Sequence, residues 1–181
     1  MSSVVISGDT SGTVTVTVPA VAGTQTATLP AATGTVMVSG NMPAFSAYAS
    51  SNTNVSANTW TKIAFQTKEF DTNTNYDAVT NYRFTPTVAG YYNFISCVQL
   101  NNGIGATQFL VSFYQNGVIA KRIVKGDSNT LFGIPVTALI YCNGTTDYVE
   151  VYANVAYTSG TLASNAGASV TYFQGYLVRT A

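Results

Sequence analysis

Apolar and polar residues alternate along much of this chain. In residues 13–18, Val14, Val16 and Val18 fall on one side of an extended backbone, and threonines fall on the other side. A period of two is typical of a half-buried β-strand. No segment of ten or more residues has the 3.6-residue apolar period of an amphipathic helix, so we expect almost no helix.

The longer, C-terminal part of the chain is predicted to contain about ten strands separated by clusters of Asn, Asp, Gly and Ser. Asn116-Gly117, between two alternating runs, predicts a tight hairpin with a type I′ turn. About ten short strands in about 140 residues favour an all-β fold, a two-sheet sandwich or jelly roll. The predicted strands are residues 44–49, 59–65, 69–71, 82–85, 90–100, 108–115, 118–124, 130–142, 148–156 and 168–178.

An eleven-residue repeat marks the beginning of the chain. Gly-Thr pairs recur at residues 12–13, 23–24 and 34–35, and Pro19 and Pro30 close the first two units. Each unit is predicted to be a short strand that ends at a turn, because proline cannot donate a hydrogen bond to a ladder. Strands this short bury too little apolar surface to offset a backbone entropy cost of about 1–2 kcal/mol per residue. We therefore expect them to pack against a partner.

A change in composition divides the chain in two. Residues 1–40 contain no aromatic residue, whereas the chain from Phe45 onward is rich in Phe and Tyr. The sequence thus predicts an N-terminal arm of short β-strands at residues 1–40 and a globular domain at residues 41–181.

The charge balance excludes several classes of partner. Charged residues make up only 8% of the chain, and seven Lys and Arg balance seven Asp and Glu. Without a basic surface we expect no nucleic-acid binding and no electrostatic attachment to membranes. No apolar run approaches the roughly 18 residues that span a bilayer, and the first residues lack the pattern of a secretory signal, so we expect no membrane insertion.

The residues offer little for catalysis. The chain has no histidine, which argues against Ser-His, Cys-His and zinc hydrolase sites. No pair of carboxylates has a motif spacing, and Asp71, Asp127 and Asp147 lie in turn-rich segments where Asp hydrogen-bonds the backbone. We expect a protein that is not an enzyme and has no metal or cofactor. The carboxylates considered are Glu69, Asp71, Asp77, Asp127, Asp147 and Glu150.

Two other groups of residues leave alternatives open. Cys97 and Cys142 lie in apolar runs and are interpreted as reduced thiols; the alternative is a cross-strand disulfide. The basic cluster at Lys121, Arg122 and Lys125 is interpreted as the charged guard of an edge strand, and the alternative is contact with an anionic host glycan.

The aromatic residues also allow two interpretations. We expect five of them in the core; the alternative is that aromatic side chains at the surface stack on sugar rings. The expected core aromatics are Trp60, Phe65, Phe94, Phe113 and Phe173.

Residues 43–181, about three quarters of the chain, resemble a known jelly-roll family. The matching segments are Pro43 to Tyr48, Phe84-Thr85-Pro86 with Ala89 to Phe94, Val111 to Gly117, Val136 to Ala153 and Tyr172 to Val178. In order and spacing they are similar to the globular head shared by the complement first-component q subunit and the tumour-necrosis-factor superfamily. The resemblance implies a homotrimer, and it suggests that Tyr91, Tyr152, Tyr172 and Tyr176 lie at the subunit interface.

The N-terminal repeat resembles a short module at the start of virion proteins of tailed bacteriophages. Together the two resemblances imply a structural protein of the virion, assembled in the host cytoplasm. We expect a trimeric capsid decoration or cement protein that binds the major capsid protein, with a tail protein as the alternative partner. The arm would add its strands to a partner, and three arms would add avidity. The expected attachment residues are Thr13, Val14, Val16, Val18, Leu29, Val36 and Val38.

The alternative function is that of a tail-fibre or head-fibre tip whose globular domain binds a host surface glycan.

Overall fold

The computed structural model describes residues 3–21, 23–28, 31, 33–34, 36–100, 105–128, 132–158 and 160–181. The chain divides into two compact units, residues 1–34 and residues 35–181. The sequence placed a domain boundary slightly later, after residue 40.

The first unit contains one antiparallel hairpin, formed by β1 (Ser3–Ser7) and β2 (Thr13–Thr17). Its turn includes Gly12 at φ 79°, a conformation that suits glycine. β2 was predicted from the sequence, whereas β1 was not. The second and third repeat units were predicted to be strands, but the residues described there, 23–28, 33–34 and 36–38, contain none. Residues 23–28 lack the alternating valines of β2, and in the third unit Val36 and Val38 alternate over only three residues.

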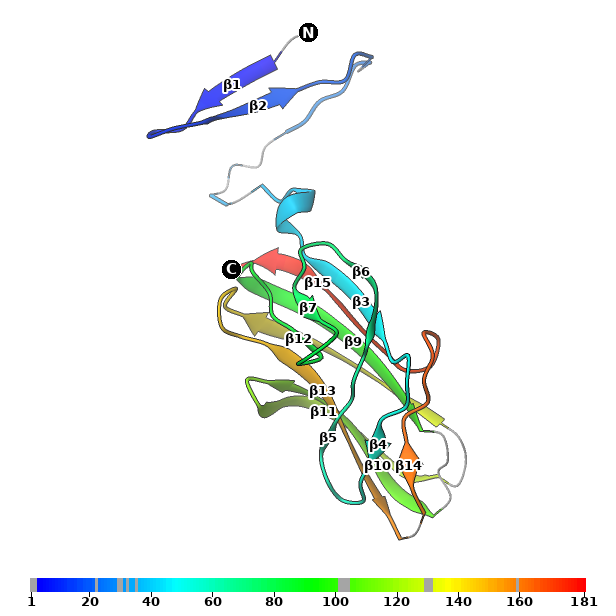
Figure 1. Ribbon diagram of the computed structural model, residues 1–181. Coiled ribbons are helices and arrows are strands. Elements are labelled where there is room, and N and C mark those ends of the chain that lie inside the picture. The colour runs from blue at the N-terminus through cyan, green and yellow to red at the C-terminus, as the bar shows by residue number, and fades with distance from the viewer. Residues whose placement is uncertain are drawn as a thin grey trace. The chain divides into compact units, whose positions relative to one another are not determined.

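The second unit is a jelly-roll sandwich of two antiparallel sheets (Figure 1). The first sheet has the order β12-β9-β15-β3-β6: β12 (Phe132–Cys142), β9 (Gly90–Leu100), β15 (Tyr172–Thr180), β3 (Ala44–Tyr48) and β6 (Thr67–Asp71). All-β jelly-roll architecture was the prediction, and it is confirmed.

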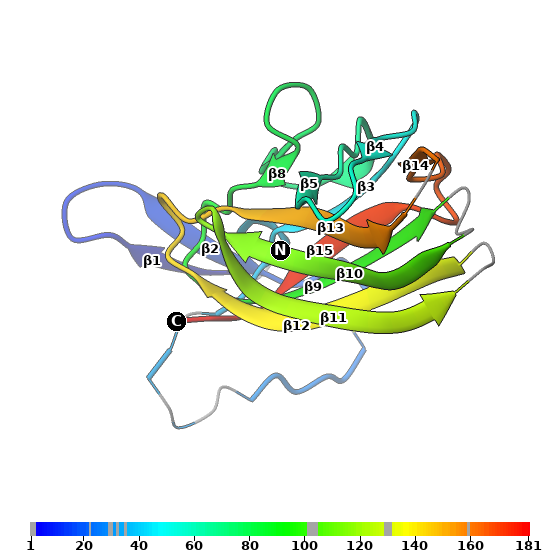
Figure 2. The same ribbon diagram turned by 90° about the horizontal axis from the view of Figure 1, so that it is seen from below.

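The second sheet has the order β11-β10-β13-β8-β7, with β5 also pairing with β13. Figure 2 shows its long strands side by side. Its strands are β11 (Val118–Ser128), β10 (Ala106–Gln115), β13 (Val149–Tyr157), β8 (Arg83–Phe84), β7 (Tyr76–Asp77) and β5 (Thr61–Lys62). The short strands β4 (Asn54–Val55) and β14 (Leu162–Ala163) form a separate pair.

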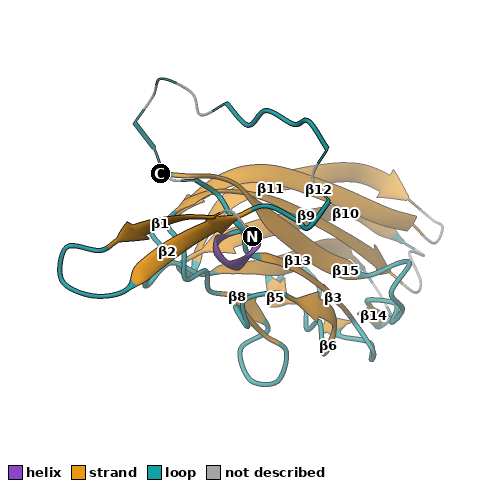
Figure 3. Ribbon diagram, turned by 90° about the horizontal axis from the view of Figure 1, so that it is seen from above, coloured by secondary structure: helices purple, strands orange, loops and turns teal. Residues whose placement is uncertain are grey.

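Helix is almost absent from the part of the chain that the structure describes. One 3-10 turn, η1 (Ser39–Asn41), is the sole helical element there, as Figure 3 shows. No described helix is long and apolar enough to cross a membrane.

Phenylalanines from the two sheets meet in the core. Phe45 of β3 stacks on Phe84 of β8, with ring centroids 4.3 Å apart, and meets Phe173 of β15 edge-on at 4.9 Å. Phe113 of β10 lies 6.0 Å from Phe94 of β9. All five side chains are fully buried, which fixes the two sheets face to face.

The prediction of a type I′ turn is confirmed in its geometry. Asn116 and Gly117 have φ values of 54° and 81°, as a type I′ turn requires, and they join β10 to β11. Gly175 in β15 is a point of close approach, because a Cβ there would lie 2.7 Å from Cδ1 of Phe94 and 3.0 Å from Cε1 of Phe45.

Replacing Gly175 with Ala should lower the free energy of unfolding by about 1–3 kcal/mol, because the added methyl group overpacks the phenylalanine core. Urea unfolding followed by circular dichroism measures this change. Gly126→Ala is the matched control, since a Cβ at this exposed strand position meets no atom within 4 Å. Equal stability of the two variants would contradict the packing described for Gly175.

Candidate functional site

The outward face of the first sheet carries a group of exposed apolar side chains. Along β9, β12 and β15 alternate residues point into the core, and the residues between them point outward. This outward face is called the first-sheet face below. Its exposed large apolar residues are Phe70, Tyr91, Leu139, Tyr141, Tyr176 and Val178.

Strand register brings these side chains together. Tyr91 lies opposite Tyr141, with ring centroids 5.5 Å apart. Asn93 lies between Leu139 and Tyr176 on the neighbouring strands, and its amide nitrogen donates to the Tyr176 hydroxyl at 3.5 Å. Exposed apolar side chains on adjacent strands form a patch of the kind that marks an interaction surface.

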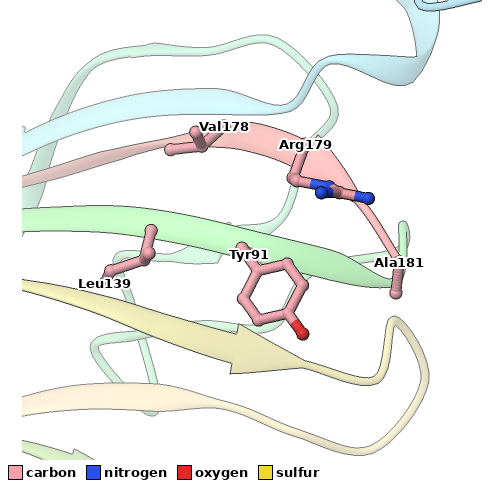
Figure 4. A pocket seen from close by; sticks show the side chains of 5 residues that line it. All are labelled: Tyr91, Leu139, Val178, Arg179 and Ala181. Atoms are coloured by element: carbon pink, nitrogen blue, oxygen red, sulfur yellow. The ribbon is translucent and has the colours of Figure 1, made fainter.

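Two hollows open on the first-sheet face. One has a volume of about 460 Å³ and is shown in Figure 4, where Leu139, Tyr91 and Arg179 come from three adjacent strands. Val178 and Ala181 complete its lining. The other, about 230 Å³, lies between β6 and β9 and includes Phe70, Ile95 and Tyr176. A patch with hollows of this size can accept side chains of another protein.

The structure gathers three of the four tyrosines predicted at a subunit interface. Tyr91 and Tyr176 are exposed on the first-sheet face. Tyr172 is half-buried on the same face, where it lies opposite Cys97 of β9 in the strand register. Tyr152 is not with them, because β13 belongs to the second sheet. Sequence reasoning missed Leu139, Tyr141 and Phe70, although the alternation within residues 130–142 could have indicated the first two.

The residues predicted to attach the chain to a virion lie in several places. Thr13, Val14 and Val16 are in β2, Val18 follows it, and all four are exposed. Val36 and Val38 are exposed but lie outside any strand, in the second unit. Leu29 lies outside the described residues.

The hairpin of the first unit has an apolar face. Val4 lies opposite Val16 and Ile6 opposite Val14, so these four side chains share one side of the hairpin. Each of them is more than half exposed. Val5 and Thr15 pair on the other side. Sequence reasoning missed Val4 and Ile6, which contribute half of this face.

The outward face of the second sheet carries a different group, the aromatic shelf, made of Trp60, Tyr114 and Tyr152. Tyr114 lies 4.1 Å from Tyr152 and 5.7 Å from Trp60, measured between ring centroids. All three are partly exposed. Trp60 was expected in the core, and that prediction is wrong, because it precedes β5 at the outer surface of the sheet. The other four predicted core aromatics, Phe65, Phe94, Phe113 and Phe173, are fully buried.

An ion pair lies beside the aromatic shelf. The Lys62 ammonium binds Glu150, whose side chain is buried on the outward face of β13, and also donates to the carbonyl of Asn81. Burial, followed by the nearby Glu150 carboxylate, raises the pKa of Tyr152 to about 12. Burial and the Glu150 carboxylate both disfavour the charged tyrosinate, so Tyr152 keeps a neutral hydroxyl at physiological pH.

The carboxylates in the loops hold turns. Asp71 accepts hydrogen bonds from the backbone N–H groups of Asn75 and Tyr76, and Asp147 accepts from Asn143 and from the side chain of Asn116. Both were predicted to be turn formers. Asp77 accepts from three consecutive backbone N–H groups, of which those of Thr80 and Val79 contribute most to lowering its pKa well below the usual range. Among the described residues no group of three or more metal-binding side chains is found.

Neither cysteine lies in surroundings that would activate its thiol as a nucleophile. The two thiols are free, as preferred from the sequence, with Cys97 half-buried and Cys142 buried. Burial, with a smaller contribution from Asp147, raises the pKa of Cys142 to about 12. A thiol that stays protonated at neutral pH is a poor nucleophile.

Comparison with known proteins agrees with the fold. No family model matches the sequence, and no curated protein matches it either. Solved structures of the tumour-necrosis-factor type are similar. The structure of Eiger TNF from S. frugiperda superposes with a TM-score of 0.58 at 8% identity over 77% of this chain and 93% of that one. Murine APRIL gives 0.55 at 12% identity over 76% and 99%.

At these identities the similarity shows the fold alone: residues 35–181 form a tumour-necrosis-factor-type jelly roll. The fold similarity predicted from the sequence segments is therefore confirmed for the globular domain.

Alkylation should distinguish the two thiols. At pH 8 iodoacetamide should modify Cys142 at least about a hundredfold more slowly in the folded protein than in urea, because the thiol is buried and protonated. Mass spectrometry of peptides measures the rates, with half-buried Cys97 as the internal reference.

The raised pKa of Cys142 also means that the contribution of this thiol to stability is complete below about pH 9 and is lost as the pH rises toward 12. Rapid labelling of Cys142 at pH 8 without unfolding would contradict its burial.

Proposed function

We propose that this chain is a structural protein of a bacteriophage virion, a trimeric capsid decoration or cement protein anchored by its N-terminal hairpin. The observation that carries the proposal is the exposed apolar hairpin of residues 3–17. A two-stranded hairpin is marginally stable in water, and this one exposes Val4, Ile6, Val14 and Val16 on one side. A partner that covers this side would stabilise both the hairpin and the attachment.

The hairpin supports attachment by strand addition. Both β1 and β2 are edge strands, so each has backbone groups that can pair with another chain. Asp9 is the sole charged residue in residues 1–34, and it lies in the turn outside both strands. A neutral, apolar hairpin suits docking on a large protein assembly such as a shell of capsid protein, with a tail protein as the alternative site.

The first-sheet face supports the threefold assembly that the family resemblance implies. Its exposed Tyr91, Leu139, Tyr176 and Val178 would be covered by neighbouring copies, and its hollows would receive their side chains. Tyr152 is left out of this interface, because it lies on the second sheet. Three hairpins on one trimer would bind a repeating lattice with avidity, since the second and third attachments are effectively intramolecular.

A second candidate function is a fibre tip that binds host glycan, and the aromatic shelf on the second sheet favours it. The two functions use different surfaces of the chain, so each can be tested separately.

Replacing Tyr176 with Lys should convert the trimer to monomers, because an unpaired ammonium buried in the interface costs about 3–5 kcal/mol. Analytical ultracentrifugation at micromolar concentration measures the change. The control is Val79→Lys, which introduces the same charge at a highly exposed loop position. A Tyr176→Lys protein that sediments as a trimer would place the interface elsewhere.

Replacing Val16 with Asp should abolish binding of the purified protein to phage particles that lack this protein. A carboxylate on the apolar side of the hairpin cannot be buried against the capsid without a hydrogen-bonding or charged partner. Co-sedimentation with the particles measures binding. The matched control, Thr15→Asp, puts the same charge on the opposite side of the same strand and should bind as the unmodified chain does. Equal loss in both variants, or no loss in Val16→Asp, would argue against docking through this side.

A further inference from the structure

The aromatic shelf lies on a part of the second sheet that has polar and charged neighbours. Trp60 comes from the loop before β5, Tyr114 from β10 and Tyr152 from β13, so three separate segments hold the rings in place. The edge-on contact of Trp60 with Tyr114 and the close contact of Tyr114 with Tyr152 fix their orientation. The shelf is thus a preformed aromatic surface that solvent reaches.

Strand register places a row of side chains across this face. Lys62 of β5 lies opposite Tyr152 of β13, Tyr152 lies opposite Ser112 of β10, and Ser112 lies opposite Arg122 of β11. Residues directly opposite in antiparallel strands project from the same side of the sheet. Arg122 is therefore on the side of the aromatic shelf, two strands or about 10 Å from Tyr152.

The two cations of this row differ in their partners. Lys62 is neutralised by Glu150 and is also hydrogen-bonded to the Asn81 carbonyl. Arg122 is exposed and forms no ion pair within the part of the chain that the structure describes. The row therefore presents one available guanidinium beside the aromatic shelf.

We propose that the aromatic shelf and Arg122 together bind an acidic polysaccharide built from carboxylated pyranose rings. The apolar C–H face of a pyranose ring packs on an aromatic face, and a guanidinium fork matches a carboxylate in geometry and charge. Lys62, held in its ion pair with the buried Glu150, borders the shelf with a partly exposed ammonium that can donate to a sugar hydroxyl. This inference deepens the second candidate function and is independent of the hairpin and of particle attachment.

The first-sheet face is a poorer glycan site than the aromatic shelf. It also exposes tyrosines, but Arg179 at its margin already donates to the carbonyl of Thr180 and is less available to a carboxylate than Arg122. The two faces lie on opposite sides of the sandwich, so a chain that uses one for assembly keeps the other for a ligand.

The fluorescence of Trp60 gives a direct measurement of binding at the shelf, because Trp60 is the one tryptophan of the sequence. The full chain is titrated with polygalacturonate, a polymer of carboxylated pyranose rings, while tryptophan fluorescence is recorded. Neutral dextran is titrated in parallel. We expect a saturable fluorescence change with polygalacturonate and binding at least about tenfold weaker with dextran, as expected for loss of a charge-assisted contact.

Arg122→Gln should weaken polygalacturonate binding about tenfold. Lys121→Gln is the matched control: it removes the same charge from the adjacent residue, which lies opposite Phe113 and so projects from the other side of β11, and its affinity should stay within twofold. Trp60→Ala, assayed by retardation in native gels containing the polysaccharide, should also lose binding while retaining the thermal transition of the unmodified chain.

Three results would overturn the proposal: no saturable fluorescence change, equal loss of affinity in Arg122→Gln and Lys121→Gln, or equal binding of dextran and polygalacturonate. None of these results depends on particles or on trimer formation, so they leave the proposed attachment function untouched.

Discussion

The interlocking of phenylalanines between the two sheets is the constraint on which the rest of this structure depends. Phe45, Phe94 and Phe173 from the first sheet meet Phe84 and Phe113 from the second, and all are fully buried. Burial of each ring contributes about 1.5–3 kcal/mol or more. Once these rings fix which side of each strand faces inward, the alternate residues must face outward. The first-sheet face and the aromatic shelf are consequences of that core.

Under the proposed function, stability and attachment belong to different parts of the chain. Residues 35–181 have a core of their own, whereas the hairpin of residues 3–17 has none: its valines and Ile6 stay exposed. A domain that is stable by itself can present its surfaces without rearrangement. A hairpin whose apolar side is buried only by a partner becomes fully ordered when that partner is bound. This is the physical basis for proposing the hairpin as the attachment element.

Much of the fold could be predicted from local patterns. A run of mostly apolar and aromatic residues located β9 at Gly90–Leu100, and Asn116-Gly117 located the β10–β11 turn, because both signals are encoded within a few residues. The two-residue strands β4, β7 and β14 could not be predicted, since they are too short to show a period. β1 was missed because Val4, Val5 and Ile6 form a continuous apolar run that shows no period of two.

The surfaces were harder to predict because they depend on contacts between distant segments. Alternation shows that Trp60 and Tyr152 lie in or beside strands, but not which sheet those strands join. Pairing of β5 with β13 puts both residues on the second sheet, away from Tyr91 and Tyr176. Likewise the apolar side of the hairpin needs β1, whose Val4 and Ile6 lie opposite Val16 and Val14.

The central claim is that the chain is a threefold domain held on a virion by its hairpins, and cryo-electron microscopy of intact virions that carry the protein tests it most directly. The account predicts jelly-roll domains in groups of three on the capsid, joined through the first-sheet face, with residues 3–17 of each chain buried against capsid protein. Domains attached through the jelly roll with the hairpins free in solvent would contradict it, as would virions with no such domain on their surface.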